Sequence, residues 1–134
     1  MGNCCILKSV ATSTWKVWVW DVQTNRLFCQ DNKYHAEQNW IKNGGTCSSK
    51  VRLIIVARIR MIEDRFEIFT SKPCCHCTKR LHHIARQLKS KRGQTLMIRY
   101  IDHDFRLTKA MKVSDLSEGK LCGRYLKYSN NQMG

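Results

Sequence analysis

The chain has 134 residues, of which 43% are hydrophobic and 25% are charged, a composition that excludes a disordered chain and is typical of one globular domain. No run of about 18 apolar residues occurs in the sequence, so we expect no membrane span and no membrane partner. Lysine and arginine outnumber aspartate and glutamate by 24 to 10, and the resulting net charge of +14 favours a polyanionic partner.

The first third of the chain predicts a β-hairpin followed by a short helix. Residues 15–21 are apolar in both alternating sets, which predicts a strand buried on one or both faces. Residues 23–25 form a tight connection to a partner strand at 27–29. A helix then carries Ala36, Trp40 and Ile41 on one face and ends at the Asn-Gly-Gly of residues 43–45.

The remainder predicts strands that alternate with a longer helix. Residues 51–59 are an apolar, β-branched run and predict a central strand, and residues 66–69 predict another. The helix that follows has an apolar face of Leu81, Ile84, Ala85 and Leu88 and ends near Gly93. Residues 95–101 and 106–113 predict two strands joined by a turn at 102–104, too short for a crossover helix, so this pair should be antiparallel. A short helix is expected near residues 115–116.

Two short motifs carry the chemistry: His35-Ala36-Glu37, and the Pro-Cys-Cys-His-Cys of residues 73–77. One imidazole and the two thiolates of Cys74 and Cys77 are three zinc ligands, and three ligands leave a position that can hold water. Cys74 and Cys77 share one face of a helical turn, and a helix N-terminus favours the thiolate form. Glu37, beside the metal but not bound to it, can move protons.

A structural zinc site is the alternative interpretation of these motifs, and it requires a fourth ligand. The sequence offers candidates for this ligand: Cys47, Cys75, His76 and His82. The two-part motif favours the catalytic interpretation. We expect the cysteines outside the motif to be free thiols: Cys4, Cys5, Cys29, Cys47 and Cys122.

The two motifs, in this order, resemble those of the zinc-dependent cytidine deaminase-like superfamily. The resemblance covers residues 12–113 and implies a three-layer α-β-α fold with a mixed sheet and a C-terminal antiparallel hairpin, in one domain over residues 1–134. It also implies one Zn²⁺ per chain, held by His35, Cys74 and Cys77, which activates water to convert cytosine to uracil, and Glu37 as proton shuttle.

The chain departs from the family pattern in three places. The stretch between Glu37 and Pro73 is long and predicts an inserted hairpin, and no leading helix is evident before Trp15. Residues 29–34 lack the Gly-x-Asn-x-Glu segment of free-nucleoside cytidine deaminases. The final hairpin resembles the cytidine and toxin deaminase branches rather than the AID/APOBEC branch, which has a helix there.

Several residues are candidates for substrate contact. Aromatic rings near the pocket could stack on a base, and the basic residues that flank the second motif could contact phosphates. The substrate-contact candidates are Asn32, Tyr34, Ala36, Pro73, Tyr100 and Phe105, and the backbone-contact candidates are Lys72, Lys79 and Arg80. Trp40 and His103 are expected to be core and turn residues.

Three functions follow from these features. The charge favours deamination of cytosine in single-stranded DNA or RNA. Deamination of free cytidine, deoxycytidine or their nucleotides is the second, and a non-catalytic, zinc-stabilised nucleic-acid-binding module is the third; an adenine or guanine substrate is less favoured.

The cysteine content bears on the compartment. Eight cysteines without a signal peptide indicate a reducing compartment, the cytoplasm or nucleus. The start Met1-Gly2-Asn3-Cys4-Cys5 invites a lipid anchor, but position six is Ile6 instead of serine or threonine, which disfavours one.

Overall fold

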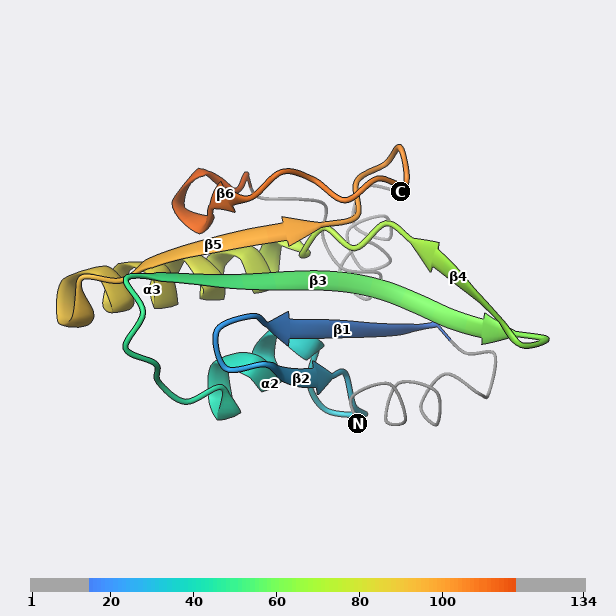
Figure 1. The fold of residues 1–134 in the computed structure, drawn as a ribbon, viewed down its shortest axis with the longest axis horizontal. Coiled ribbons are helices and arrows are strands. Elements are labelled where there is room, and N and C mark those ends of the chain that lie inside the picture. Colours follow the sequence, from blue (N-terminus) through green and yellow to red (C-terminus); the bar gives the residue numbers. More distant parts are fainter. Residues whose placement is uncertain (1–14, 118–134) are drawn as a thin grey trace, which may run out of the picture.

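The computed structural model describes residues 15–117 (Figure 1). Its elements in chain order are β1 (Lys16–Asp21), β2 (Arg26–Cys29), α2 (Ala36–Asn43), β3 (Val51–Ile62), β4 (Arg65–Phe69), α3 (Cys75–Arg92), β5 (Thr95–Tyr100), β6 (Met111–Lys112) and the 3₁₀ turn η1 (Val113–Asp115). Residues 1–5, where the sequence disfavours a lipid anchor, and Cys122 lie outside the described residues.

The strands form one mixed sheet. Its order is β2-β1-β3-β5-β6, and β4 pairs with the C-terminal part of β3. β3 and β5 are parallel, whereas the other neighbouring strands are antiparallel. The predicted α/β class with a mixed sheet is therefore confirmed, and the central position predicted for residues 51–59 is that of β3.

Both helices pack on the same face of the sheet. α2 contacts β1 and β2, α3 contacts β5, and the two helices contact each other, so that both lie behind the sheet in Figure 1. The core between the layers includes Val19, Trp40, Ile54, Leu81 and Ile98. The described residues thus form two layers, a sheet and the helices on one of its faces (Figure 1), which is compatible with a three-layer α/β fold. No helix in the described range 15–117 is both long and apolar enough to cross a lipid bilayer.

Two hairpins follow the predictions. β1 and β2 pair antiparallel through the connection at residues 22–25, where Asn25 has a φ of 55°. β3 and β4 form the hairpin expected between the two motifs, and it turns at Glu63 and Asp64, whose φ angles are 49° and 65°. Two positive φ angles are the signature of the turn that matches strand twist. β3 runs to Ile62, beyond the predicted end at residue 59.

The C-terminal pair is antiparallel as expected, but its second strand is shorter than the predicted range 106–113. Ile98 pairs with Met111, whereas Ile101 forms an isolated bridge with Leu107. Three residue steps on one side therefore face four on the other, which is a β-bulge. Within it, the Thr108 N–H donates to the Tyr100 carbonyl oxygen, and the Thr108 hydroxyl oxygen accepts from the Tyr100 N–H. The short helix expected at 115–116 is the single turn η1.

A buried ion pair closes the C-terminal end of α2. The Arg52 guanidinium lies 2.6 Å from Asp21 Oδ2, and both side chains are at most 3% exposed. Trp40 Nε1 donates to the same oxygen at 2.9 Å. Arg52 also donates to the carbonyls of Gly44 and Gly45, which follow the helix and have no partner within it. The arginine thus connects the end of α2 to β1 and β3.

Candidate metal centre and cavity

His35 is placed by the segment that leads into α2. The residue is the N-cap of the helix, with extended backbone at φ −67° and ψ 160°. Its backbone N–H donates to Gln38 Oε1 at 3.1 Å. Before it, the Asp31 carboxylate accepts hydrogen bonds from the N–H groups of Lys33 and Tyr34. Within an α-helix, side chains two residues apart point in nearly opposite directions. His35 precedes α2 and has an extended backbone, so this restriction does not apply to His35 and Glu37.

The two cysteines begin α3. Cys74 is the N-cap, with φ −66° and ψ 167°, and its sulfur accepts a hydrogen bond from the N–H of Cys77 at 3.5 Å. Pro73 directly precedes this cap, and its carbonyl accepts the hydroxyl hydrogen bond of Thr78. The Cys-x-x-Cys spacing therefore places one thiol at the cap and the other within the first turn.

His35, Cys74 and Cys77 converge. His35 Nδ1 lies 3.3 Å from Cys77 Sγ and 3.9 Å from Cys74 Sγ, and the three ligand atoms all lie within 4.8 Å of one another. Tetrahedral zinc, with bonds of about 2.0–2.1 Å to nitrogen and about 2.3 Å to sulfur, needs nitrogen and sulfur about 3.6 Å apart. The donor set and its spacing fit one metal ion.

No fourth ligand from the described residues joins this group. The alternatives Cys75, His76, His82 and Cys47 are absent from it. Instead, His82 Nε2 lies 2.8 Å from the carbonyl oxygen of Leu116, and the sulfur of Cys47 contacts Gln94. Three ligands and an open position are the arrangement of catalytic rather than structural zinc sites.

A hydrogen bond between the two thiols shifts their pKa values in opposite directions. The hydrogen bond from the Cys77 thiol and, more weakly, the contact with His35 together lower the pKa of Cys74 to about 3, although partial burial acts in the opposite direction. The same hydrogen bond to Cys74, followed by burial, raises the pKa of Cys77. The lowered pKa favours the thiolate form of Cys74, which is the form that binds metal.

Glu37 lies in the first turn of α2 and is only 4% exposed. Burial raises its pKa to about 7, although a backbone hydrogen bond and the nearby His35 act in the opposite direction. A carboxyl group with a pKa near neutrality can both accept and donate a proton under physiological conditions. Its position and protonation behaviour suit a general acid–base residue.

A cavity of about 340 Å³ contains these groups. Its size is that of a small-molecule site, and it opens between the helix N-termini and the β1–β3–β4 surface. The residues that line it are Trp15, Val17, Gln30, His35, Glu37, Arg58, Thr70, Ser71, Lys72 and Cys74. His35, Cys74 and the buried carboxyl group of Glu37 therefore line one shared space.

Most residues predicted to contact substrate lie outside this cavity. Ala36 and Pro73 are buried beside the ligands, and Tyr100 packs against the core. Asn32 is exposed. The Tyr34 ring is covered by the ammonium group of Lys42 at 4.2 Å. Phe105 is exposed, and none of the six predicted positions lines the cavity.

The three basic candidates are all exposed, but only Lys72 lines the cavity. Its ammonium group donates to the hydroxyl of Ser117 at 2.8 Å. Lys79 and Arg80 lie on the first turns of α3, and Arg80 Nε lies 3.4 Å from His76 Nε2. These three basic residues therefore lie just before α3 and on its first turns.

Sequence reasoning missed several cavity residues. Trp15, Val17 and Arg58 reach the cavity through the pairing of β1 with β3, in which Val17 lies opposite Arg58. Only the register of the two strands could have placed them together. Thr70 and Ser71 had an available signal, because only Lys72 separates them from the Pro-Cys motif.

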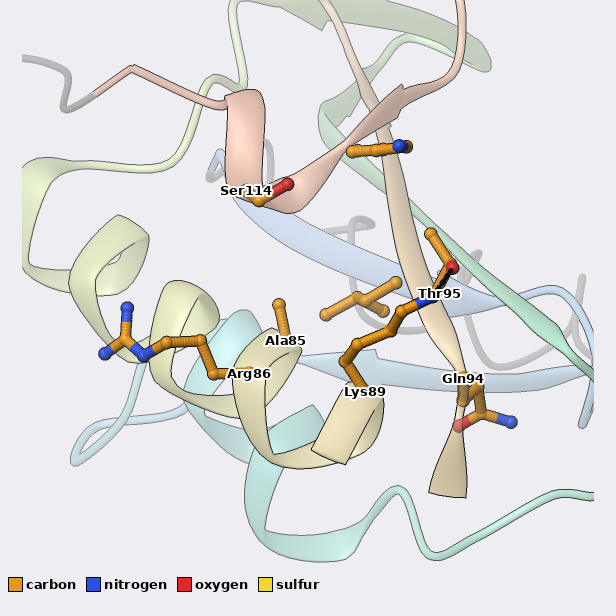
Figure 2. A pocket seen from close by; sticks show the side chains of 8 residues that line it. Ala85, Arg86, Lys89, Gln94, Thr95 and Ser114 are labelled. Carbon is orange, nitrogen blue, oxygen red and sulfur yellow. Dashed lines mark hydrogen bonds between the residues drawn. The ribbon is translucent and has the colours of Figure 1, made fainter. Parts of the chain in front are cut away.

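A second cavity, of about 220 Å³, lies between α3, the start of β5 and the segment around Ser114 (Figure 2). It is lined by Ala85, Arg86, Lys89, Gln94, Thr95, Leu96, Lys112 and Ser114. Arg86 points away from the others in Figure 2. None of these residues belongs to the metal-ligand group, so the first cavity is the candidate functional site.

Comparisons with protein-family models, with curated proteins and with solved structures find no match to this chain.

Proposed function

We propose that this protein is a zinc-dependent deaminase that converts cytosine to uracil in single-stranded DNA or RNA. The observation that carries the proposal is the buried carboxyl group of Glu37, which lines the same cavity as His35 and Cys74. A purely structural metal site has no use for a buried carboxyl group beside it. The resemblance of both motifs to cytidine deaminases supports the choice of reaction.

Each residue has a distinct role in this proposal. His35, Cys74 and Cys77 hold the zinc ion, which when bound lowers the pKa of water toward neutrality. Glu37 accepts a proton from the attacking water and donates it to the ring nitrogen of the base. It then carries the second proton to the departing amino group, so that ammonia leaves. A pKa of about 7 allows both transfers without a large energetic penalty.

Charge supports a polynucleotide over a free nucleotide. The net charge is +14, and the cavity itself is lined by Arg58 and Lys72. One or two cations suffice to bind a mononucleotide, whereas a bound strand uses many. The β3–β4 hairpin extends the sheet (Figure 1), and its strand β3 contributes Arg58 to the cavity lining.

A substrate panel tests the proposal. Zinc-loaded protein is incubated with single-stranded and double-stranded DNA, with RNA, and with free cytidine, adenosine and their nucleotides, and products are identified by mass spectrometry. Uracil formed within single strands, and lost in Glu37→Ala, is the expected result. Uracil formed only from free nucleosides or nucleotides would select the second function. No product with any substrate from protein of full zinc content would contradict deamination.

A further inference from the structure

Three aromatic side chains form a continuous surface beside the cavity. The rings of Trp15 and Phe69 are 5.6 Å apart, and those of Phe69 and Phe105 are also 5.6 Å apart. Phe69 is 41% exposed and Phe105 is 51% exposed, although burial of such rings would stabilise the fold. We call Trp15, Phe69 and Phe105 the aromatic platform.

Two arginines of β3 lie against this platform. The Arg58 guanidinium lies 5.7 Å from the Trp15 ring centre and 5.4 Å from that of Phe69. Arg60 lies 4.5 Å from the Trp15 ring and forms an ion pair with Glu67 at 3.2 Å. No ion pair of Arg58 occurs among the described residues. The positive charge of Arg58 is therefore available to form an ion pair with an anionic ligand.

The loop that presents Phe105 holds a costly conformation. Phe105 has a φ of 60°, a left-handed geometry that costs an L-residue about 1–2 kcal/mol. The Asp102 carboxylate holds the loop by accepting hydrogen bonds from the N–H groups of Asp104 and Arg106. A strained backbone that exposes a large ring points to a role in binding.

The platform is continuous with the candidate active site. Trp15 and Arg58 belong both to the cavity lining and to the platform's contacts. Phe69 directly precedes Thr70 and Ser71, which also line the cavity. Ser71 connects this rim to the end of β5, because its N–H donates to the carbonyl of Ile101 and its hydroxyl accepts from the Ile101 N–H.

We infer that the platform binds the nucleotide next to the one in the cavity, with its base packed against the exposed rings of Phe69 and Phe105, which are inclined to each other by 61°, and its phosphate paired with Arg58. Exposed rings beside a cation are the chemistry that recognises an unpaired base and its backbone. A duplex does not offer an unstacked base to such a surface, so the ligand is a single strand. This inference rests on the proposed function and specifies how its substrate is held.

Binding by a turnover-deficient protein tests the platform. Zinc-loaded Glu37→Ala protein is titrated with a fluorescein-labelled, single-stranded oligonucleotide that carries one cytosine, and the anisotropy is measured. On this background, Phe69→Ala and Phe105→Asn should each raise the Kd about tenfold, from the loss of one base–aromatic stack. Asparagine is chosen because it tolerates the left-handed conformation, so the loop is retained. Phe69→Tyr should restore binding, and circular dichroism confirms the fold.

Phe66→Ala is the matched control. Phe66 lies on the same strand and is 50% exposed, but it pairs with Met61 whereas Phe69 pairs with Arg58, so the two rings lie on opposite faces. Its substitution should leave the Kd unchanged. Arg58→Ala should reduce the slope of log Kd against log salt by about 0.7, the value for one phosphate contact on a single strand. Arg92 lies at the C-terminal end of α3, opposite the end that begins at Cys75, so Arg92→Ala should not reduce this slope.

The outcomes separate this inference from the proposed function. Equal loss of binding in Phe66→Ala and Phe69→Ala, or no loss in Phe69→Ala and Phe105→Asn, would overturn the platform even if the wild type deaminates cytosine. Loss confined to the platform variants supports it, even if the substrate panel yields no product. Equal affinity for single-stranded and duplex oligonucleotides would also overturn it.

Discussion

His35 Nδ1 lies 3.3 Å from Cys77 Sγ, although 42 residues separate the two in the chain. The proximity arises because α2 and α3 pack against each other with both N-termini at one edge of the site. The cap residue of one helix therefore meets the first turn of the other. The β3–β4 hairpin lies between them in sequence without separating them in space.

The first prediction concerns metal content. Cys77→Ser and His35→Ala should each lower bound zinc well below one equivalent, because two ligands do not hold the ion in a site that is open already. Cys75→Ala is the matched control, since Cys75 lies between the ligands but outside the group. Elemental analysis of purified protein measures the zinc. Full occupancy in Cys77→Ser, or loss in Cys75→Ala, would show that the ligand set is wrong.

The second prediction concerns metal removal. Zinc that binds only the folded state adds stability by mass action, about 2.7 kcal/mol when free zinc is a hundredfold above its Kd. Chelation should therefore lower the Tm of the wild type. Glu37→Gln should retain this shift because Glu37 is not in the ligand group, whereas Cys77→Ser should lose it. Thermal unfolding with and without chelator measures both, and an equal shift in the two variants would contradict the assignment.

The third prediction concerns the buried ion pair. Asp21→Ala should lower the free energy of unfolding by about 3–5 kcal/mol, because it leaves the Arg52 charge buried without its partner. Glu67→Ala removes the half-exposed partner of Arg60 and should cost less than about 1 kcal/mol. Urea denaturation compares the two variants. A cost for Asp21→Ala as small as that for Glu67→Ala would refute a structural role for the pair.

The fourth prediction concerns acid. Hydrogen bonds from the backbone N–H groups of Tyr34 and then Lys33 hold the pKa of Asp31 below 3.8. A lowered folded-state pKa means that the carboxylate contributes its full stability above 3.8 and loses it as the pH falls through the folded-state value. A carboxyl ¹³C NMR titration should give a midpoint below 3.8 for Asp31. In Asp31→Asn this part of the acid dependence of stability should vanish. A midpoint at or above 3.8 for Asp31 would contradict the two backbone hydrogen bonds to its carboxylate.

Local patterns in the sequence predicted much of this molecule. The apolar period of Leu81 and Leu88 and the glycine at residue 93 predicted α3 and its end. The spacing of the two motifs predicted the ligand group of His35, Cys74 and Cys77. The helix signals and each of the two motifs lie within a few residues of chain, where local geometry decides the result. The meeting of the two motifs, by contrast, was predicted from the ligand chemistry that they share.

Features that depend on pairing between distant segments were not predicted. Arg58 and Trp15 reach the cavity only through the register of β1 against β3. The β-bulge opposite β5 makes the last strand shorter than predicted, and no residue type at 106–113 indicated a bulge. The partner of Arg52 is equally invisible in sequence, since 31 residues separate it from Asp21.

The central claim is that Glu37 performs acid–base chemistry beside a metal held by His35, Cys74 and Cys77. The most direct measurement is mass spectrometry of a cytosine-containing single strand after incubation with wild type or Glu37→Gln, both at equal zinc content. We expect uracil with the wild type and none above background with Glu37→Gln, at unchanged zinc occupancy and Tm. Equal uracil formation by both proteins, or none by either, would contradict it.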